Sequence, residues 1–127
     1  MKQKALVDTG ATISCMDETV FERIKHTFKL RIPLPLNEAN CILTAEKDKY
    51  LRITASAILL VKINGYIMEQ KFLIVENLLQ GCILGMDFLD NNQAVIDIAN
   101  KKLLLHDNLV AVPMITLDDA DNVIRIA

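Results

Sequence analysis

Three consecutive residues, Asp8, Thr9 and Gly10, suggest more chemistry than any other part of the sequence. The aspartate follows a short apolar stretch, residues 5–7, and precedes small residues that favour a tight turn. A carboxylate that ends an apolar strand and faces a cleft suits general acid–base chemistry on a water molecule. The three-residue word alone is a weak indication, because the same residues also form ordinary structural turns, in which the aspartate caps backbone amides.

Length and composition limit what the chain can be. It has 127 residues, of which 52% are hydrophobic, and a formal net charge of −2. This length predicts a single domain over residues 1–127. The near-neutral charge argues against a nucleic-acid partner or an anionic membrane surface. The longest apolar run, 55–63, contains Lys62 and is shorter than the roughly 18 residues of a membrane span, so we expect no membrane partner.

Cysteine and histidine residues give no sign of a metal site or of a cofactor. The three cysteines, Cys15, Cys41 and Cys82, are widely spaced and include no CxxC pair, so we interpret them as free thiols. Free thiols indicate a reducing compartment, and we expect an intracellular, cytoplasmic protein. His26 and His106 have no neighbour at metal-ligand spacing. We therefore expect no metal and no cofactor.

Short strand-like segments dominate the chain. Asn64-Gly65 predicts a β-hairpin between 57–63 and 67–75, and Asp17 predicts the N-cap of a short helix. Pro33 and Pro35 restrict 30–36 to an edge strand or a loop. Residues 86–91 are predicted as one or two helical turns, and 117–127 as a loosely ordered tail. Further strands are expected at 4–7, 12–15, 42–44, 50–54, 82–84, 94–98, 103–106 and 110–116.

These elements predict an all-β domain, a small closed barrel with one or two short helices. A faint internal repeat supports this fold. Residues 73–75 and 81–85 repeat the order of 5–10, an apolar strand followed by a glycine turn, but carry Ile83-Leu84-Gly85 and no acid at the matching place. Only one of the two related halves carries a carboxylate. We therefore expect the chain to supply half of a two-acid site.

Two motifs together resemble the retropepsin-type aspartic proteases, and among them those encoded in polyproteins of Ty3/gypsy-like retrotransposons. The motifs are VDTGATIS, residues 7–14, and CILGMDFL, residues 82–89, and they occur in the order and at the separation typical of that family. The resemblance continues through AVIDI, residues 94–98, and KLLL, residues 102–105. With the second motif present, a structural turn in an unrelated β protein becomes the weaker interpretation.

The resemblance implies a role for each residue of the catalytic loop. Two carboxylates that share one proton would hydrolyse a peptide bond with water, one acting as base and one as acid. Because the chain has one such motif, the catalytic Asp8 would need Asp8 of a second copy, and a homodimer follows. The supporting residues would be Thr9 across the two-fold axis, Gly10 and Ala11 at the substrate, Thr12 in a hydrogen bond with Asp87, and Gly85 beneath the loop. An alternative for Asp87 is the N-cap of the following helix.

The polar segment 46–49 matches the family's flap, a hairpin that closes over an extended polypeptide substrate. Besides Gly10, the substrate-binding candidates are Leu43, Glu46, Lys47, Tyr50, Ile53, Ile83 and Leu84. The apolar members of this set are equally compatible with a purely structural role in the core.

Two features depart from the family pattern. Only seven residues precede Asp8, so the N-terminal strand looks truncated and the strand beside the catalytic loop would have an open edge. The flap segment contains no glycine. The sequence thus supports two hypotheses: a dimeric aspartic endopeptidase that processes a retroelement polyprotein, or an inactive retropepsin-like domain used for dimerisation or peptide binding.

Overall fold

The computed structural model describes the backbone of residues 3–24, 29–33, 41–43, 50–117 and 120–126, and the side chains of residues 3–24 and 51–114. Twelve strands and two helices form in these parts of the chain. In chain order they are β1 Gln3–Val7, β2 Cys15–Asp17, α1 Glu18–Arg23, β3 Lys29–Pro33, β4 Cys41–Leu43, β5 Tyr50–Ile63, β6 Tyr66–Val75, β7 Cys82–Leu84, α2 Met86–Asn91, β8 Val95–Asp97, β9 Lys102–Leu105, β10 Val110–Pro113, β11 Ile115–Leu117 and β12 Ala120–Ile126.

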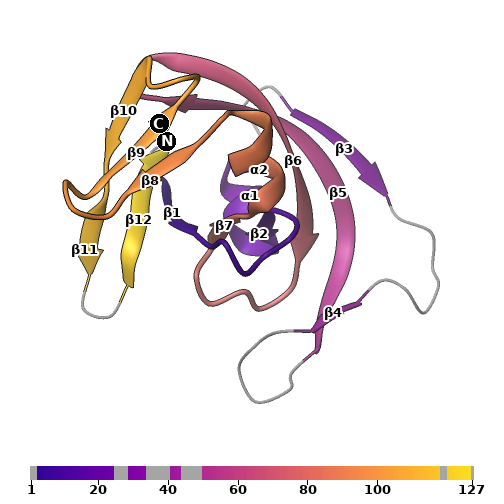
Figure 1. Ribbon diagram of the computed structural model, residues 1–127. Coiled ribbons are helices and arrows are strands. Elements are labelled where there is room, and N and C mark those ends of the chain that lie inside the picture. The colour runs from indigo at the N-terminus through magenta and orange to yellow at the C-terminus, as the bar shows by residue number, and fades with distance from the viewer. Residues whose placement is uncertain (1–2, 25–28, 34–40, 44–49, 118–119, 127) are drawn as a thin grey trace.

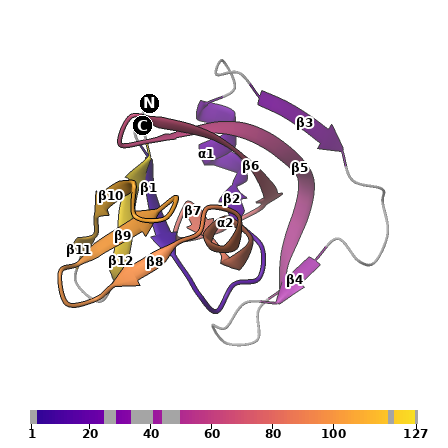
Figure 2. The same cartoon turned by 45° about the horizontal axis from the view of Figure 1, so that its top comes forward.

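The strands form two sheets. The larger has nine strands, in the order β11-β12-β1-β7-β2-β6-β5-β3 with β4 paired to β5, and the smaller has the order β10-β9-β8. Figures 1 and 2 show β5 curving around the two helices, with the smaller sheet on their other side. The all-β prediction with two short helices is confirmed. Pairing among the described residues follows an open path from β11 to β3.

The β5–β6 hairpin is the longest element of the larger sheet. Its turn residues Asn64 and Gly65 have φ of 49° and 87°, as the sequence predicts, and Ile63 pairs with Tyr66. The Asn64 side chain donates a hydrogen bond to the Ala111 carbonyl at 2.8 Å and so ties the turn to β10. The sequence predicts two segments, 50–54 and 57–63, where the structure has the single strand β5.

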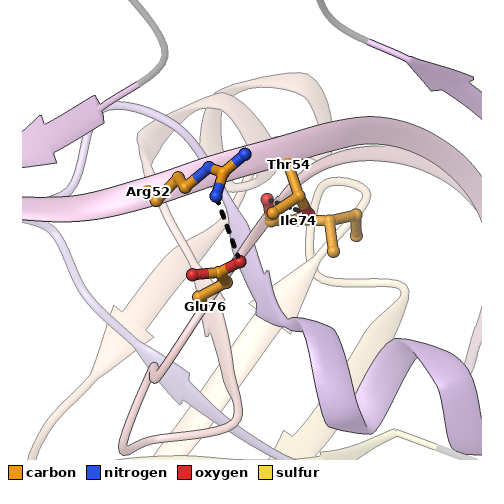
Figure 3. A network of polar contacts seen from close by, with 4 residues as sticks. All are labelled: Arg52, Thr54, Ile74 and Glu76. Carbon is orange, nitrogen blue, oxygen red and sulfur yellow. Dashed lines mark hydrogen bonds and ion pairs between the residues drawn. The ribbon is translucent and has the colours of Figure 1, made fainter.

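A β-bulge explains how one continuous strand serves two clusters of apolar residues. The register between β5 and β6 shifts between Ile53 and Ala55, which leaves Thr54 as the extra residue. The Thr54 hydroxyl donates to the Ile74 carbonyl at 3.3 Å, and the side chains of Arg52 and Glu76 form an ion pair at 3.9 Å (Figure 3). On one side of the bulge Ala55 joins the main core, and on the other side Ile53 joins a second cluster.

The main core lies between the larger sheet, the helices and the smaller sheet. Its largest fully buried side chains are Phe21, Phe72, Phe88, Ile63, Ile74, Leu84, Leu103, Leu105, Val7 and Val110. The second apolar cluster is smaller and contains Cys15, Ile53, Val75 and Leu78, with Leu51, Leu73 and Ile83 packed against it while partly exposed.

Helix α1 begins where the sequence predicts. The Asp17 carboxylate accepts hydrogen bonds from the amide and the hydroxyl of Thr19 and, through its other oxygen, from the Leu78 amide at 2.9 Å. Burial alone would raise the pKa of Asp17, but these hydrogen bonds, together with one from the Val20 amide, outweigh burial and lower the pKa below its usual value of 3.8. One buried carboxylate therefore joins the helix to the β6–β7 connection.

The C-terminal residues differ from the sequence-based expectation of a loosely ordered tail over 117–127. Strand β12 pairs antiparallel with β1, from Gln3↔Ile126 to Leu6↔Val123, and β11 adds to the outer side of β12. The open edge expected beside the catalytic loop is therefore covered, by a strand from the other end of the chain. Periodicity along the sequence carries no information about such a distant partner.

The remaining elements agree with the sequence apart from their boundaries. Strand β3 ends the sheet path, as expected for an edge segment that contains Pro33. The strand expected over 12–15 begins only at Cys15, and the strand expected over 110–116 is divided into β10 and β11. Neither described helix, each of six residues, has the length and apolarity needed to cross a membrane.

We predict that Asp17→Asn lowers the free energy of unfolding by about 1–3 kcal/mol at pH 7, because the amide nitrogen replaces an oxygen that accepts a buried N–H. Since the folded-state pKa of Asp17 is lowered, its stabilisation is present above pH 3.8 and is lost as the pH falls through the folded-state value. Denaturant unfolding at neutral and strongly acidic pH measures both effects. Asp90→Asn, at an exposed position of α2, is the matched control, and a pH-independent gap between wild type and Asp17→Asn would contradict the prediction.

Candidate active site

Asp8 stands at the end of β1, where the parallel neighbour β7 also ends. The pairs Leu6↔Ile83 and Val7↔Leu84 lead to a hydrogen bond from the Asp8 amide to the Leu84 carbonyl at 3.0 Å. A turn then begins, in which the Ala11 amide donates to the Asp8 carbonyl at 3.1 Å. Asp8 is half-buried, whereas Thr9 and Gly10 are exposed. We call residues 8–14 the Asp8 loop.

Within the described part of the chain, the Asp8 carboxylate has a single hydrogen-bond partner. Its Oδ1 atom accepts from the Gly10 amide at 2.8 Å. A Cβ atom on Gly10 would lie 3.1 Å from that same oxygen, while the Gly10 φ lies outside the left-handed region. Gly10 therefore leaves room beside the carboxylate, and its own backbone conformation does not require glycine.

The start of α2 holds the other side of the Asp8 loop. The Met86 amide donates to the Ala11 carbonyl at 2.7 Å, and the Asp87 amide donates to the Thr12 carbonyl at 3.2 Å. A Cβ atom on Gly85 would lie 2.7 Å from the Ala11 carbonyl oxygen and 3.0 Å from Ile13 backbone atoms. The loop and the β7–α2 junction thus approach so closely that only glycine fits at Gly85.

A buried polar network lies directly behind this junction. Asp87 Oδ1 accepts from the amide of Ser14 at 3.0 Å, from its hydroxyl at 2.7 Å and from the Phe88 amide at 2.7 Å. Asp87 Oδ2 accepts from Gln70 Nε2 at 3.0 Å. The Ser14 hydroxyl also accepts from the Gly85 amide at 3.0 Å. Ser14 is 0% and Gln70 4% exposed, while Asp87 is half-buried, so the network is partly shielded from water.

This network corrects the sequence-based reading of Asp87. The expected partner Thr12 meets Asp87 only through backbone atoms, and the carboxylate binds Ser14. The alternative, Asp87 as the N-cap, is wrong, because Gly85 is the N-cap of α2 and Asp87 lies in its first turn. Sequence reasoning missed Gln70 entirely. The sequence feature that could have revealed Gln70 is its position in β6. Buried and exposed residues alternate there, and the polar Gln70 stands at a buried position between Met68 and Phe72.

The strand register shows which face of the sheet Asp8 shares. Leu6 pairs with Ile83, Ile83 with Cys15, and Cys15 with Leu73, so these side chains project from one face. Asp8 follows Leu6 by two residues and lies on that face as well. The second apolar cluster is therefore on the same side of the sheet as the aspartate.

The predicted substrate-binding residues differ in their exposure and in the face of the sheet on which they lie. Ile83 is partly exposed in the second cluster and Ile53 is buried in it. Leu84 is fully buried in the main core, on the opposite face, and has no surface to offer a substrate. Leu43 of β4 pairs with Tyr50 of β5, and for these two residues only the backbone is described. Glu46 and Lys47 lie outside the described residues.

The two described cysteines are free and buried. Burial raises the pKa of Cys15 to about 11, with a smaller contribution from the negative charge of Asp87. Burial, with a smaller contribution from Cys15, raises the pKa of Cys82 to about 12. Both thiols are therefore protonated at neutral pH and unsuited to nucleophilic catalysis. Among the described residues, no group of three or more His, Cys, Asp or Glu side chains is placed to hold a metal ion.

Comparisons with known proteins agree with this geometry. Residues 1–91 match the family described as "gag-polyprotein putative aspartyl protease". The fold is similar to the crystal structure of the retroviral protease-like domain of Ddi1 from Leishmania major, with a TM-score of 0.63 and 23% sequence identity over 91% of this chain and 82% of that chain. The search of the curated proteins found no match.

The chain belongs to the gag-polyprotein aspartyl protease family, and its fold is retropepsin-like. The family match spans both the Asp8 loop and the β7–α2 junction that supports it.

We predict that Gly85→Ala destabilises the fold by about 1–3 kcal/mol, because the added methyl group would collide with backbone atoms of the Asp8 loop. Denaturant unfolding measures the loss. Asp90→Asn, at an exposed position of the same helix α2, is the control and should unfold as the wild type does. Equal stability of Gly85→Ala and wild type would show that the junction is looser than described.

A second prediction concerns the thiols. In a Cys41→Ser background, Cys15 and Cys82 of the native protein should react with a disulfide reagent at pH 8 at least about tenfold more slowly than in denaturant, because both are buried and protonated. Labelling followed by absorbance measures the two rates. Native labelling at the rate of a free cysteine would contradict the assigned burial.

Proposed function

We propose that this protein is an aspartic endopeptidase that acts as a homodimer on a polypeptide substrate. The observation that carries the proposal is Asp8, half-buried at the paired ends of β1 and β7 with one carboxylate oxygen engaged by Gly10, in a chain of an aspartyl protease family. Its proposed substrate is a retroelement polyprotein, because the family is described by the gag polyprotein. The free thiols support action in a reducing compartment, which we take to be the cytoplasm.

A second copy is needed because one chain offers one suitable acid. Asp87 is the other carboxylate next to the loop, and both of its oxygens already accept hydrogen bonds, from Ser14, Gln70 and Phe88. The half of the fold that ends in Ile83-Leu84-Gly85 has no acid where the first half has Asp8. Asp8 of a second copy would complete the pair, and Thr9, exposed beside it, would bond across the two-fold axis.

The proposed mechanism uses the pair as a single titrating unit. Two adjacent carboxylates share one proton, since both cannot be ionised at close range. The ionised Asp8 would take a proton from a water molecule, which attacks the peptide carbonyl carbon. The protonated Asp8 of the other copy would donate to the carbonyl oxygen. The proton taken from water would pass from the first Asp8 to the amide nitrogen, and the C–N bond would break to release the amine. The other Asp8 would recover its proton from a hydroxyl of the intermediate, which leaves the carboxylic acid product.

The proposed substrate lies extended across the face that Asp8 shares with the second apolar cluster. The Gly10 carbonyl and the small Ala11 would meet its backbone, and Ile83 with Ile53 would meet an apolar side chain next to the cleaved bond. Leu43, Glu46, Lys47 and Tyr50 remain the proposed contacts from the flap side, where β4 pairs with the start of β5. We remove Leu84 from the set because it is fully buried on the other face.

The test is cleavage of peptides with apolar residues at the scissile bond. Asp8→Asn should abolish turnover while leaving the thermal unfolding curve unchanged, and Asp90→Asn should retain wild-type turnover. The wild type should be most active at acidic pH and be inhibited by statine-type transition-state mimics. An Asp8→Asn variant that cleaves at the wild-type rate would reject the proposal.

The sequence of the flap segment favours a second candidate function. Residues 44–49 contain no glycine, where the family commonly uses glycine for close approach to the substrate. The alternative is an inactive retropepsin-like module that dimerises or binds peptides. Sedimentation and a peptide library separate the two: a dimer that binds peptides with no turnover indicates the module, and turnover lost in Asp8→Asn indicates the enzyme.

A further inference from the structure

The amide of Gln70 stands between the β5–β6 hairpin and the Asp8 loop. Its Nε2 atom donates both of its hydrogens, one to Asp87 Oδ2 at 3.0 Å and one to the Lys71 carbonyl at 2.8 Å. Gln70 is 4% exposed and lies between two core residues of β6. A polar side chain at such a position is costly unless both donors are satisfied, and here they are.

The chain of hydrogen bonds continues from Asp87 into the loop. Asp87 Oδ1 accepts both the amide and the hydroxyl hydrogen of Ser14, and the same hydroxyl accepts from the Gly85 amide. Gly85 in turn lies against the Ala11 carbonyl. Gln70 and Ser14 both donate to Asp87, so the hydrogen bonds from β6 and from the Asp8 loop converge on its carboxylate.

The arrangement also fixes the direction in which the Asp87 side chain points. With Oδ1 occupied by Ser14 and Phe88, only Oδ2 is left for Gln70. A donor at that place would face the Gln70 amide hydrogens and have no partner. Both carboxylate oxygens of Asp87 must therefore accept hydrogen bonds. This requirement differs from that of a helix N-cap.

We propose that Gln70 is a positioning residue for Asp8: through Asp87 and Ser14 it fixes the Asp8 loop relative to the β5–β6 hairpin, whose other strand begins at the proposed flap. The inference rests on the proposed function for its effect on catalysis. Its structural part, a loop held from β6, stands independently of any activity.

The experiment compares Gln70→Met, which keeps the length of the side chain and removes the donor, with Asp87→Asn, which turns Oδ2 into a donor. Asp90→Asn on the exposed side of the same helix is the matched control. Amide hydrogen exchange of Gly10, Ala11 and Ser14 reports the loop directly, and thermal unfolding reports the whole fold. The double variant Gln70→Met/Asp87→Asn completes a cycle.

We expect exchange at the loop amides to become about tenfold faster in Gln70→Met and in Asp87→Asn, with no change in Asp90→Asn and less than additive change in the double variant. Where the wild type cleaves peptides, kcat should fall about tenfold in Gln70→Met with KM within about twofold, because the substrate contacts are untouched.

Unchanged loop exchange in both single variants would overturn the inference, as would faster exchange only in proportion to a loss of global stability. The readouts separate two failures. An inactive wild type rejects the proposed function while the exchange data still decide the role of Gln70. An active Gln70→Met with wild-type kcat rejects the positioning role while the proposed function stands.

Discussion

The backbone of the Asp8 loop rests directly on the junction between β7 and α2, and the other features of the site depend on this contact. Asp8 donates to Leu84, Met86 donates to Ala11, and no Cβ atom fits between the two segments at Gly85. Two segments more than 70 residues apart in the sequence thereby define one small rigid unit. The Asp8 carboxylate is presented at its edge, half-buried, whereas both oxygens of the neighbouring Asp87 are engaged by Ser14, Phe88 and Gln70.

The local elements of this unit could be predicted because each has a local cause. Asp17 caps α1 through its own carboxylate, and Asn64-Gly65 forms a turn that requires positive φ at both residues. Gly85 drew attention as the end of a short apolar strand, and the structure gives the steric reason. These features were predicted from a few adjacent residues, without knowledge of a distant partner.

The remaining features arise from contacts between distant segments. The pairing of β12 with β1 joins the two ends of the chain, and the bulge at Thr54 determines which cluster Ile53 enters. Ile83 and Leu84 are adjacent and similar in the sequence, yet lie on opposite faces, so only one of them can approach a substrate. The partner of Asp87 was predicted in the right loop at the wrong residue, because the loop is not a regular strand, and its contacts with the β7–α2 junction leave Thr12 exposed and Ser14 buried.

The central claim, that catalysis needs one Asp8 from each of two copies, is tested most directly by mixing subunits. Wild-type protein is allowed to exchange subunits with a tenfold excess of the Asp8→Asn variant, and turnover is measured per wild-type chain. If each active unit requires two aspartates, random pairing should lower that turnover about tenfold. Turnover per wild-type chain that stays constant as the variant is added would show that a single copy suffices, and would contradict the account.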